Sequence, residues 1–134
     1  TLLGWITDKE KFFNDIDTFL QPASDEPFGL TILESFNYHV PVISVNTGGP
    51  KEIITHNKNG YLYQNATSES ELYTLMHKIY NNQNHIPIIT KNAYQDLEHK
   101  FSYQNLCHFL RCIFINYVSI LIIHYNFICT FCIK

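Results

Sequence analysis

The sequence predicts an α/β fold, in which one parallel sheet carries helices on both faces. Two observations lead to this prediction. Short apolar runs alternate with segments whose apolar residues recur at helical spacing, as is typical of successive βαβ units. The run at residues 41–45, Pro-Val-Ile-Ser-Val, is apolar almost throughout, as expected of a parallel strand that is buried on both faces.

The strands are expected at residues 2–6, 17–21, 41–45 and 60–63. Pro22 ends the second strand, because proline has no N–H to donate to a sheet. In parallel sheets of this kind, ligands bind beyond the carboxyl ends of the strands. The loops at residues 22–29 and 46–50 both follow strands there, so a binding site is expected at these two loops.

The helices are expected at residues 9–15, 29–38, 50–55, 68–80 and 86–101. Leu30, Leu33 and Phe36 are apolar at helical spacing in the second of them. Pro50 is suited to the first position of the third helix, because an N–H there would have no partner within the helix.

Composition limits the classes of function. The 134 residues suffice for one small domain with a core, but not for two lobes. Charged residues are 16% of the chain and the formal net charge is −3, so no strong attraction to nucleic acid is expected. The sequence does not begin with Met and has no signal-peptide pattern, so we expect it to begin within a longer protein or to be trimmed.

The most informative segment is residues 22–34, Pro-Ala-Ser-Asp-Glu-Pro-Phe-Gly-Leu-Thr-Ile-Leu-Glu. It places Glu26 in a loop and Glu34 about two turns into the helix that follows, with a backbone turn at Gly29 between them. Unpaired N–H groups at a helix start suit phosphate. Carboxylates accept several hydrogen bonds and suit groups that are rich in hydroxyls. Phosphate and polyol together describe a nucleotide sugar.

The segment is followed by a Pro-Val-Ile strand, a Gly-Gly-x-x-Glu loop and a Gly-Tyr-Leu-Tyr strand. The residues of interest are Glu26, Phe28, Gly29, Leu30, Glu34, Pro41, Val42, Ile43, Gly48, Gly49, Glu52 and Gly60. In this order they resemble the donor-binding lobe of the group 1 (family 4) retaining glycosyltransferases, whose two Rossmann-like lobes form the GT-B architecture. The resemblance covers residues 3–106, so residues 1–106 are expected to form part of that lobe and residues 107–134 an apolar, cysteine-containing tail.

The resemblance implies a role for each matching residue. Glu26 would hold hydroxyls of the donor sugar near its reacting carbon, which is the catalytic position, and Glu34 would bind the ribose hydroxyls. The backbone amides that follow Glu26 would receive the sugar hydroxyls and the diphosphate, and the Gly pair would lie near the donor or the acceptor. These further donor-binding residues are Phe28, Gly29, Leu30, Thr31, Gly48 and Gly49.

The implied reaction moves a hexose from a nucleotide diphosphate sugar to a hydroxyl of a glycan or a lipid-linked sugar, with retention of anomeric configuration. No metal or other cofactor is expected, because the family stabilises the leaving diphosphate with a helix dipole and basic side chains. A missing N-terminal acceptor lobe would complete the enzyme. The alternative is a catalytically inactive module that binds only a nucleotide, a partner or a membrane surface.

Simpler interpretations of the same residues stay open. Glu34 on a solvated helix face and Glu26 as a cap on the next helix would each need no ligand. Gly48 and Gly49 also fit a plain tight turn. A glycoside hydrolase is disfavoured, because its two carboxyls face each other across a sugar at about 5–9 Å. Carboxylates on the opening turns of one helix line one side of a ligand instead.

The sequence departs from the family pattern at three places. Ala23 stands where a serine is usual, and His39 stands near the helix exit where the family has glycine. We expect His39 to tolerate a positive φ less well than glycine. The Gly-rich strand and the basic pair that neutralises the diphosphate would precede Thr1.

The apolar tail is the last segment of the sequence. Residues 112–133 contain no Asp, Glu, Lys or Arg, and as a helix they would reach about 33 Å, close to a bilayer core. A membrane helix, a helix that packs on the missing lobe and an out-of-frame coding remnant all stay open. All four cysteines lie in residues 107–134. Because residues 1–106 contain no cysteine, a protein of the reducing cytoplasm is expected, with membrane association left open. The spacing of the cysteines and their apolar surroundings disfavour zinc.

Overall fold

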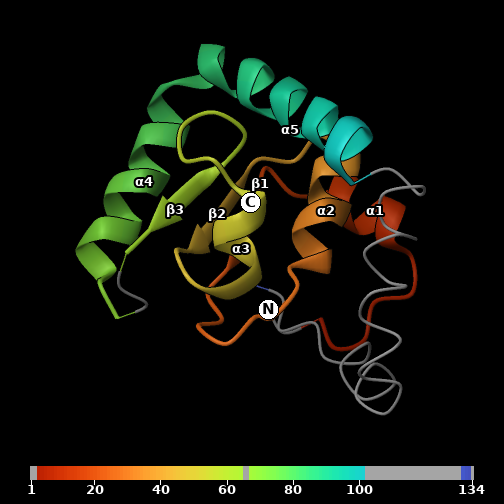
Figure 1. The fold of residues 1–134 in the computed structure, drawn as a ribbon, viewed down its shortest axis with the longest axis horizontal. Coiled ribbons are helices and arrows are strands. Elements are labelled where there is room, and N and C mark those ends of the chain that lie inside the picture. Colours follow the sequence, from red (N-terminus) through yellow and green to blue (C-terminus); the bar gives the residue numbers. More distant parts are fainter. Residues whose placement is uncertain (1–2, 65–66, 102–130, 134) are drawn as a thin grey trace.

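The centre of the molecule is a sheet with the strand order β3-β2-β1-β4 (Figure 1). The structure is a computed structural model, and it describes residues 3–64, 67–101 and 131–133. β1 (Thr18–Gln21), β2 (Val42–Val45) and β3 (Tyr61–Tyr63) run parallel. β4 (Phe131–Ile133) pairs with β1 in the antiparallel direction. The predicted parallel sheet is confirmed, and β4 adds an edge strand that the sequence did not predict.

Helices lie at all five predicted places. They are α1 (Lys9–Asn14), α2 (Leu30–Asn37), α3 (Gly48–Ile53), α4 (Glu69–Asn81) and α5 (Ile86–Lys100), with a 3-10 turn, η1 (Gln83–His85), before α5. α3 begins at Gly48, so Pro50 is its third residue, whereas the sequence predicted it as the first. Proline is tolerated there because the N–H groups of a helix's first turn have no partner within the helix.

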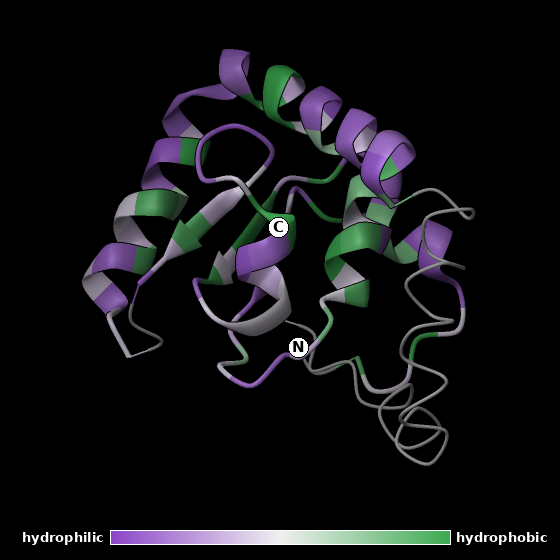
Figure 2. Cartoon of the chain, in the orientation of Figure 1, coloured by the Kyte–Doolittle hydropathy of each residue, from purple (hydrophilic) through white to green (hydrophobic). Residues whose placement is uncertain are grey.

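Successive side chains of each strand point to opposite faces of the sheet and build two apolar cores. Phe19 and Val42 belong to the core beneath α1 and α2, whereas Leu20 and Ile43 belong to the core beneath α4. The members of the first core are Phe12, Phe13, Phe19, Ile32, Phe36, Val40, Val42, Ile53, Ile54, Leu62 and Ala93. Figure 2 shows hydrophobic and hydrophilic segments alternating along α4 and α5, as expected of helices that cover a sheet.

Two details of the N-terminal half differ from the prediction. No strand is present in residues 3–8. Gly4 has a φ of 67°, which breaks an extended backbone, and Trp5 is 60% exposed, so only Ile6 of this segment packs against the core. In α2 the buried side chains include Ile32 and Phe36, whereas Leu30 is 38% exposed. Leu30, the first residue of α2, is therefore not part of the buried face of the helix.

α2 ends in a Schellman motif, a helix end in which a left-handed residue lets two backbone N–H groups bind back. His39 has a φ of 57°. Its N–H donates to Phe36 O (3.1 Å), and the N–H of Val40 donates to Ser35 O (3.0 Å). The His39 ring stacks on Tyr94 of α5, with 4.6 Å between the ring centroids. Histidine thus occupies the glycine position of the motif, where a ring contact offsets the backbone strain.

We expect His39→Val to lower the free energy of unfolding by about 2 kcal/mol, because it removes the ring stack and places a β-branched residue at a positive φ. His39→Gly is the control: it loses the same stack but relieves the backbone, so the change should stay within about 1 kcal/mol. Urea unfolding followed by circular dichroism measures both. Equal stability of the valine variant and the unsubstituted chain would contradict the strain argument.

A buried amide joins the loop before β3 to α5. Asn59 is fully buried. Its Nδ2 donates to Asp96 Oδ2 (2.7 Å) and to Ile53 O (3.1 Å), and its Oδ1 accepts from the N–H of Thr55 (2.7 Å). Asp96 also pairs with Lys100 at 2.9 Å. Burial raises the pKa of Asp96, but the hydrogen bonds from Lys100 and Asn59 and nearby lysine charges outweigh it, so the pKa of Asp96 is lowered overall.

This carboxylate gives folding a pH dependence of known sign. Because the pKa of Asp96 is lower in the folded chain than in the unfolded chain, the ionised group stabilises the fold above its unfolded pKa, and that stabilisation is lost as pH falls through the folded value. We expect Asp96→Asn to cost roughly 1–3 kcal/mol near pH 7. The difference from the unsubstituted chain should shrink below about pH 4.

Urea unfolding across this pH range tests the expectation. Glu98→Gln, at an exposed position of the same helix, is the matched control and should follow the unsubstituted chain at every pH. A constant difference between the Asp96→Asn variant and the unsubstituted chain from neutral to acid pH would rule out ionised Asp96 as the source of the stabilisation.

The predicted tail lies mostly outside the described residues, which include only residues 131–133 of it, in β4. The predicted helix at residues 112–133, the cysteine spacings and the membrane interpretation therefore stay predictions, except that residues 131–133 are strand. Within residues 3–64, 67–101 and 131–133, no helix is both long and apolar enough to span a bilayer.

Candidate functional site

The candidate site lies where β1 and β2 end. These neighbouring strands run parallel, with Phe19 opposite Val42 and Gln21 opposite Ser44. The loop after β1, residues 22–29, leads into α2, and residues 46 and 47 after β2 lead into α3. The two loops therefore meet at the carboxyl edge of the sheet, where ligands bind in folds of this class. This placement agrees with the prediction.

Gly48 and Gly49 allow the backbones of the two loops to contact each other directly. A Cβ added to Gly48, whose φ is 51°, would lie 2.4 Å from Glu26 O, and one added to Gly49 would lie 2.5 Å from the carbonyl carbon of Phe28. The N–H of Gly49 donates to Glu26 O (2.9 Å), and Thr47 Oγ1 donates to Ser24 O (2.8 Å). The pair thus does more than turn the chain, because it lets the start of α3 lie directly against the loop that carries Glu26.

Glu26 holds the backbone that leads directly into α2. Its Oε1 accepts from the N–H of Gly29 (2.8 Å) and from the N–H of Phe28 (3.2 Å). This contact is close to the simpler interpretation of Glu26 as a helix cap, although both amides precede Leu30, and it occupies two of the amides that the resemblance assigns to a ligand. The amides of Leu30 and Thr31, also assigned to the ligand, donate no hydrogen bond to any of the described residues. A ligand at this helix start would use these two amides first.

Gln21 is a site residue that the sequence analysis missed. Its side chain is buried, and its Nε2 lies 3.4 Å from both Glu26 Oε2 and Thr31 Oγ1. From the end of β1, Gln21 thus links the carboxylate of Glu26 to the first turn of α2. A polar residue that ends the strand, directly after the apolar Phe19 and Leu20 and directly before Pro22, is the signal that could have identified it.

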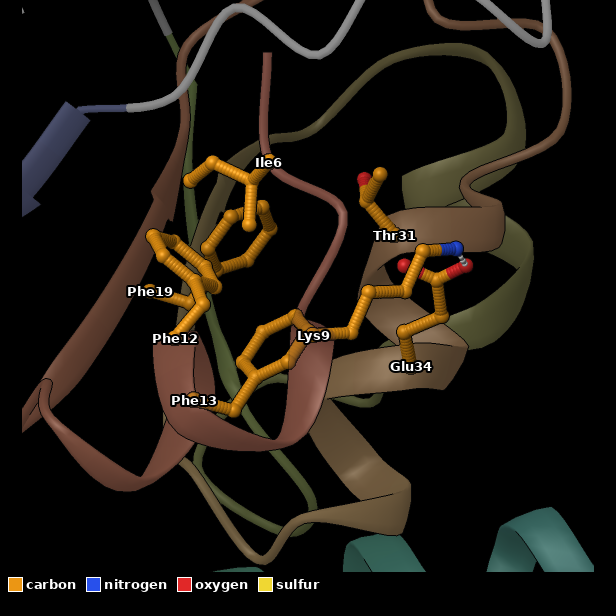
Figure 3. Close-up of a pocket in the computed structure, with 7 residues that line it drawn as sticks. All are labelled: Ile6, Lys9, Phe12, Phe13, Phe19, Thr31 and Glu34. Atoms are coloured by element: carbon orange, nitrogen blue, oxygen red, sulfur yellow. Dashed lines mark hydrogen bonds and ion pairs between the residues drawn. The ribbon is translucent and has the colours of Figure 1, made fainter. Parts of the chain in front are cut away.

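Glu34 lies on α2 beside a small pocket between α1 and α2. The residues that line the pocket are Ile6, Lys9, Phe12, Phe13, Phe19, Thr31 and Glu34. Figure 3 shows the Lys9 side chain reaching from α1 across to the carboxylate of Glu34. Lys9 Nζ lies 2.5 Å from Glu34 Oε1, and the Glu34 side chain is 26% exposed. Glu34 therefore does not lie on a solvated helix face, and Lys9 is a second residue that the sequence analysis missed.

The structure places the predicted residues in and around the first two turns of α2, but they differ in how far they are buried. Phe28, Gly29, Leu30, Thr31 and Glu34 follow one another along the loop and α2, and Gly49 is buried against this loop whereas Gly48 is exposed. Among the described residues, no group of three or more His, Cys, Asp or Glu side chains is arranged to hold a metal ion.

Comparison with known proteins identifies the family. The model of the family "Glycosyl transferases group 1" matches residues 1–96. This chain belongs to the group 1 glycosyltransferases. A sucrose synthase of Solanum tuberosum is 33% identical over 89 residues, which are 64% of this chain and 11% of that relative. The chain therefore spans about a tenth of the length of this relative.

Solved structures agree on the fold. That of Anabaena Alr3699/HepE in complex with UDP matches this glycosyltransferase chain with a TM-score of 0.72 and 23% identity, over 82% of this chain and 31% of that one. That of a mutant of S. aureus TarM, in complex with fondaparinux, alpha-GlcNAc-glycerol and UDP, matches with a TM-score of 0.74 and 24% identity, over 83% and 23%. The described α/β fold is that of a GT-B glycosyltransferase lobe.

We expect Gly49→Ala to lower the free energy of unfolding by about 2–3 kcal/mol, because a methyl group there would force apart two loops that touch through their backbones. Lys51→Ala, at an exposed position of the same helix, is the control and should change stability by less than about 0.5 kcal/mol. Thermal unfolding of the three chains measures the effect. A Gly49→Ala variant as stable as the control would show that the loops separate at little cost.

Proposed function

We propose that this chain is the donor-binding lobe of a retaining glycosyltransferase that uses a nucleotide diphosphate sugar. The reaction breaks the bond between the anomeric carbon of a hexose and the diphosphate oxygen. It forms a bond from the same carbon to an acceptor hydroxyl oxygen, on the same face of the sugar. The hydroxyl proton passes to the departing diphosphate, and the acceptor is a glycan or a lipid-linked sugar.

One observation carries the proposal: the loop before α2 and its first two turns hold two carboxylates, Glu26 and Glu34, together with two amides that have no described partner. The amides of Leu30 and Thr31 point out of a helix start, where the helix dipole favours an anion. Glu26 and Glu34 lie on either side of them along the chain and accept hydrogen bonds from hydroxyls. Phosphate and hydroxyl recognition therefore occur side by side, as a nucleotide sugar requires.

Each residue has a role in the proposed site. Glu34 binds the ribose hydroxyls, and the amides of Leu30 and Thr31 bind the diphosphate. Glu26 binds hydroxyls of the hexose near the anomeric carbon. For this, its carboxylate turns away from the amides of Phe28 and Gly29, which it occupies in the structure, and these amides then bind the donor as well.

The neighbours support this class of donor. The structures of Anabaena Alr3699/HepE were solved in complex with UDP and with UDP-glucose, and we extend a uridine nucleotide to this chain as the first donor to test. The relative from Solanum tuberosum is a sucrose synthase. We base the acceptor and the stereochemistry on the family resemblance, and both are part of the proposal.

We expect the chain to bind UDP, and Glu34→Gln to weaken this binding by about 10-fold or more, because a hydrogen bond to a charged group contributes about 1.5–3 kcal/mol. Isothermal titration calorimetry with UDP measures the dissociation constants. The free energy of unfolding in urea should differ by no more than about 1 kcal/mol between the Glu34→Gln variant and the unsubstituted chain, because the lost ion pair with Lys9 is partly exposed.

The matched control is Glu10→Gln, which removes an exposed carboxylate from α1 next to Lys9 and should leave the affinity for UDP unchanged. Equal affinity of the Glu34→Gln variant and the control would remove Glu34 from the site. Absence of UDP, GDP and ADP binding by the unsubstituted chain would overturn the proposed function.

A further inference from the structure

We propose that Lys9 is a positioning residue, which fixes the carboxylate of Glu34 for a nucleotide and offsets its negative charge. This inference rests on the proposed function and adds a residue to its site. It starts from the contact between α1 and α2, which are separated in sequence by β1 and the loop at residues 22–29. No sequence pattern at Lys9 points to this role.

α1 is anchored so that Lys9 is aimed at α2. Asp8 caps the helix, and its Oδ1 accepts from the N–H of Lys11 at 3.0 Å. Phe12 and Phe13, on the following turn, are buried in the first core, and Phe13 stacks on Tyr38 just after α2 with 5.1 Å between the ring centroids. Both ends of the contact are therefore fixed by apolar packing, and Lys9 extends from a helix that has a defined position relative to Glu34.

The pairing leaves half of the carboxylate available for a ligand. Lys9 Nζ binds Glu34 Oε1, whereas Glu34 Oε2 accepts no hydrogen bond from the described residues. A carboxylate oxygen accepts up to two hydrogen bonds, so Oε2 can bind two neighbouring hydroxyls while Oε1 stays with Lys9. Figure 3 shows the Thr31 side chain beside this pair, and both residues line the same pocket, so the paired carboxylate lies near the first turn of α2, which the proposed function assigns to the diphosphate.

The charge of Lys9 has a second effect, on the repulsion between Glu34 and a bound nucleotide. A nucleoside diphosphate is an anion, and Glu26 and Glu34 add two negative charges where it would bind. An ammonium group in contact with Glu34 reduces the repulsion between that carboxylate and the anion, and the partial burial of the pair limits screening by salt. Lys9 therefore lets Glu34 act as a hydrogen-bond acceptor for hydroxyls without repelling the phosphates.

The test compares UDP with 2′,3′-dideoxy-UDP, which lacks the hydroxyls that Glu34 would bind. The unsubstituted chain should prefer UDP by about 10-fold or more. Lys9→Met keeps most of the length of the side chain but removes the charge, and it should reduce this preference to about threefold or less, as expected for directly coupled groups. It should also weaken the binding of both nucleotides. Calorimetric titration measures all four dissociation constants.

Two variants separate positioning from a general effect. Lys9→Arg keeps an ion pair with Glu34 and should restore most of the preference for UDP. Lys11→Met removes a lysine charge from an exposed position of the same helix and should leave both affinities unchanged. A merely structural loss in Lys9→Met would weaken UDP and its dideoxy analogue by the same factor.

The outcomes are distinct. A reduced preference for the ribose hydroxyls in Lys9→Met, restored in Lys9→Arg, supports the inference. An unchanged preference, or tighter UDP binding by Lys9→Met because Lys9 competes with the nucleotide, overturns it while the proposed function stands. Absence of UDP, GDP and ADP binding by the unsubstituted chain overturns the proposed function, and this inference with it.

Discussion

The arrangement of the site depends on one backbone contact, between the Gly48–Gly49 pair and the loop at Glu26 and Phe28. No side chain larger than hydrogen fits at either glycine, because a Cβ would lie 2.4–2.5 Å from backbone atoms of that loop. This contact brings the start of α3 against the loop that leads into α2. It also fixes the position of Glu26 and of the first amides of α2 relative to the carboxyl ends of the strands. The glycines therefore shape the site whether or not a ligand touches them.

In the structure, the carboxylate of Glu26 occupies backbone amides next to α2 that the proposed function assigns to the donor. Glu26 binds the N–H groups of Phe28 and Gly29, which satisfies donors that a helix start leaves unpaired. In the proposed function, the donor takes these amides and Glu26 turns to the sugar. The same carboxylate would then stabilise the fold through the amides and the donor through its hydroxyls. Under the proposed function, this exchange lets one residue both hold the backbone before α2 and bind the sugar.

The carboxylates around α2 are each supported by a residue from another element. Gln21 supports Glu26 from the end of β1, and Lys9 supports Glu34 from α1. Neither supporting residue lies in the segment from Pro22 to Glu34 that carries the family resemblance. Residues outside the motif therefore help to orient both carboxylates, as the hydroxyl-binding role of the proposed function requires.

The sequence by itself determined the α/β class, the family resemblance and the order of the elements. Apolar runs such as residues 41–45 and the spacing within α2 report local preferences and burial, which the chain carries without long-range contacts. The segment from Glu26 to Glu34 likewise located the candidate site, because a loop, a glycine and a helix start are neighbours in sequence.

Only the tertiary structure decided the rest, because those features depend on residues far apart in the chain. The pairing of Lys9 with Glu34 spans 25 positions and needs β1 to place α1 beside α2. The strand predicted at residues 2–6 is absent from the described residues 3–6, since Gly4 adopts a positive φ and Trp5 finds no core. His39 keeps the left-handed conformation usual for glycine because Tyr94, from a helix much later in the chain, stacks on its ring. The local sequence sets the preferred conformation of each of these residues. Packing against residues far away in the chain determines which conformation each one adopts.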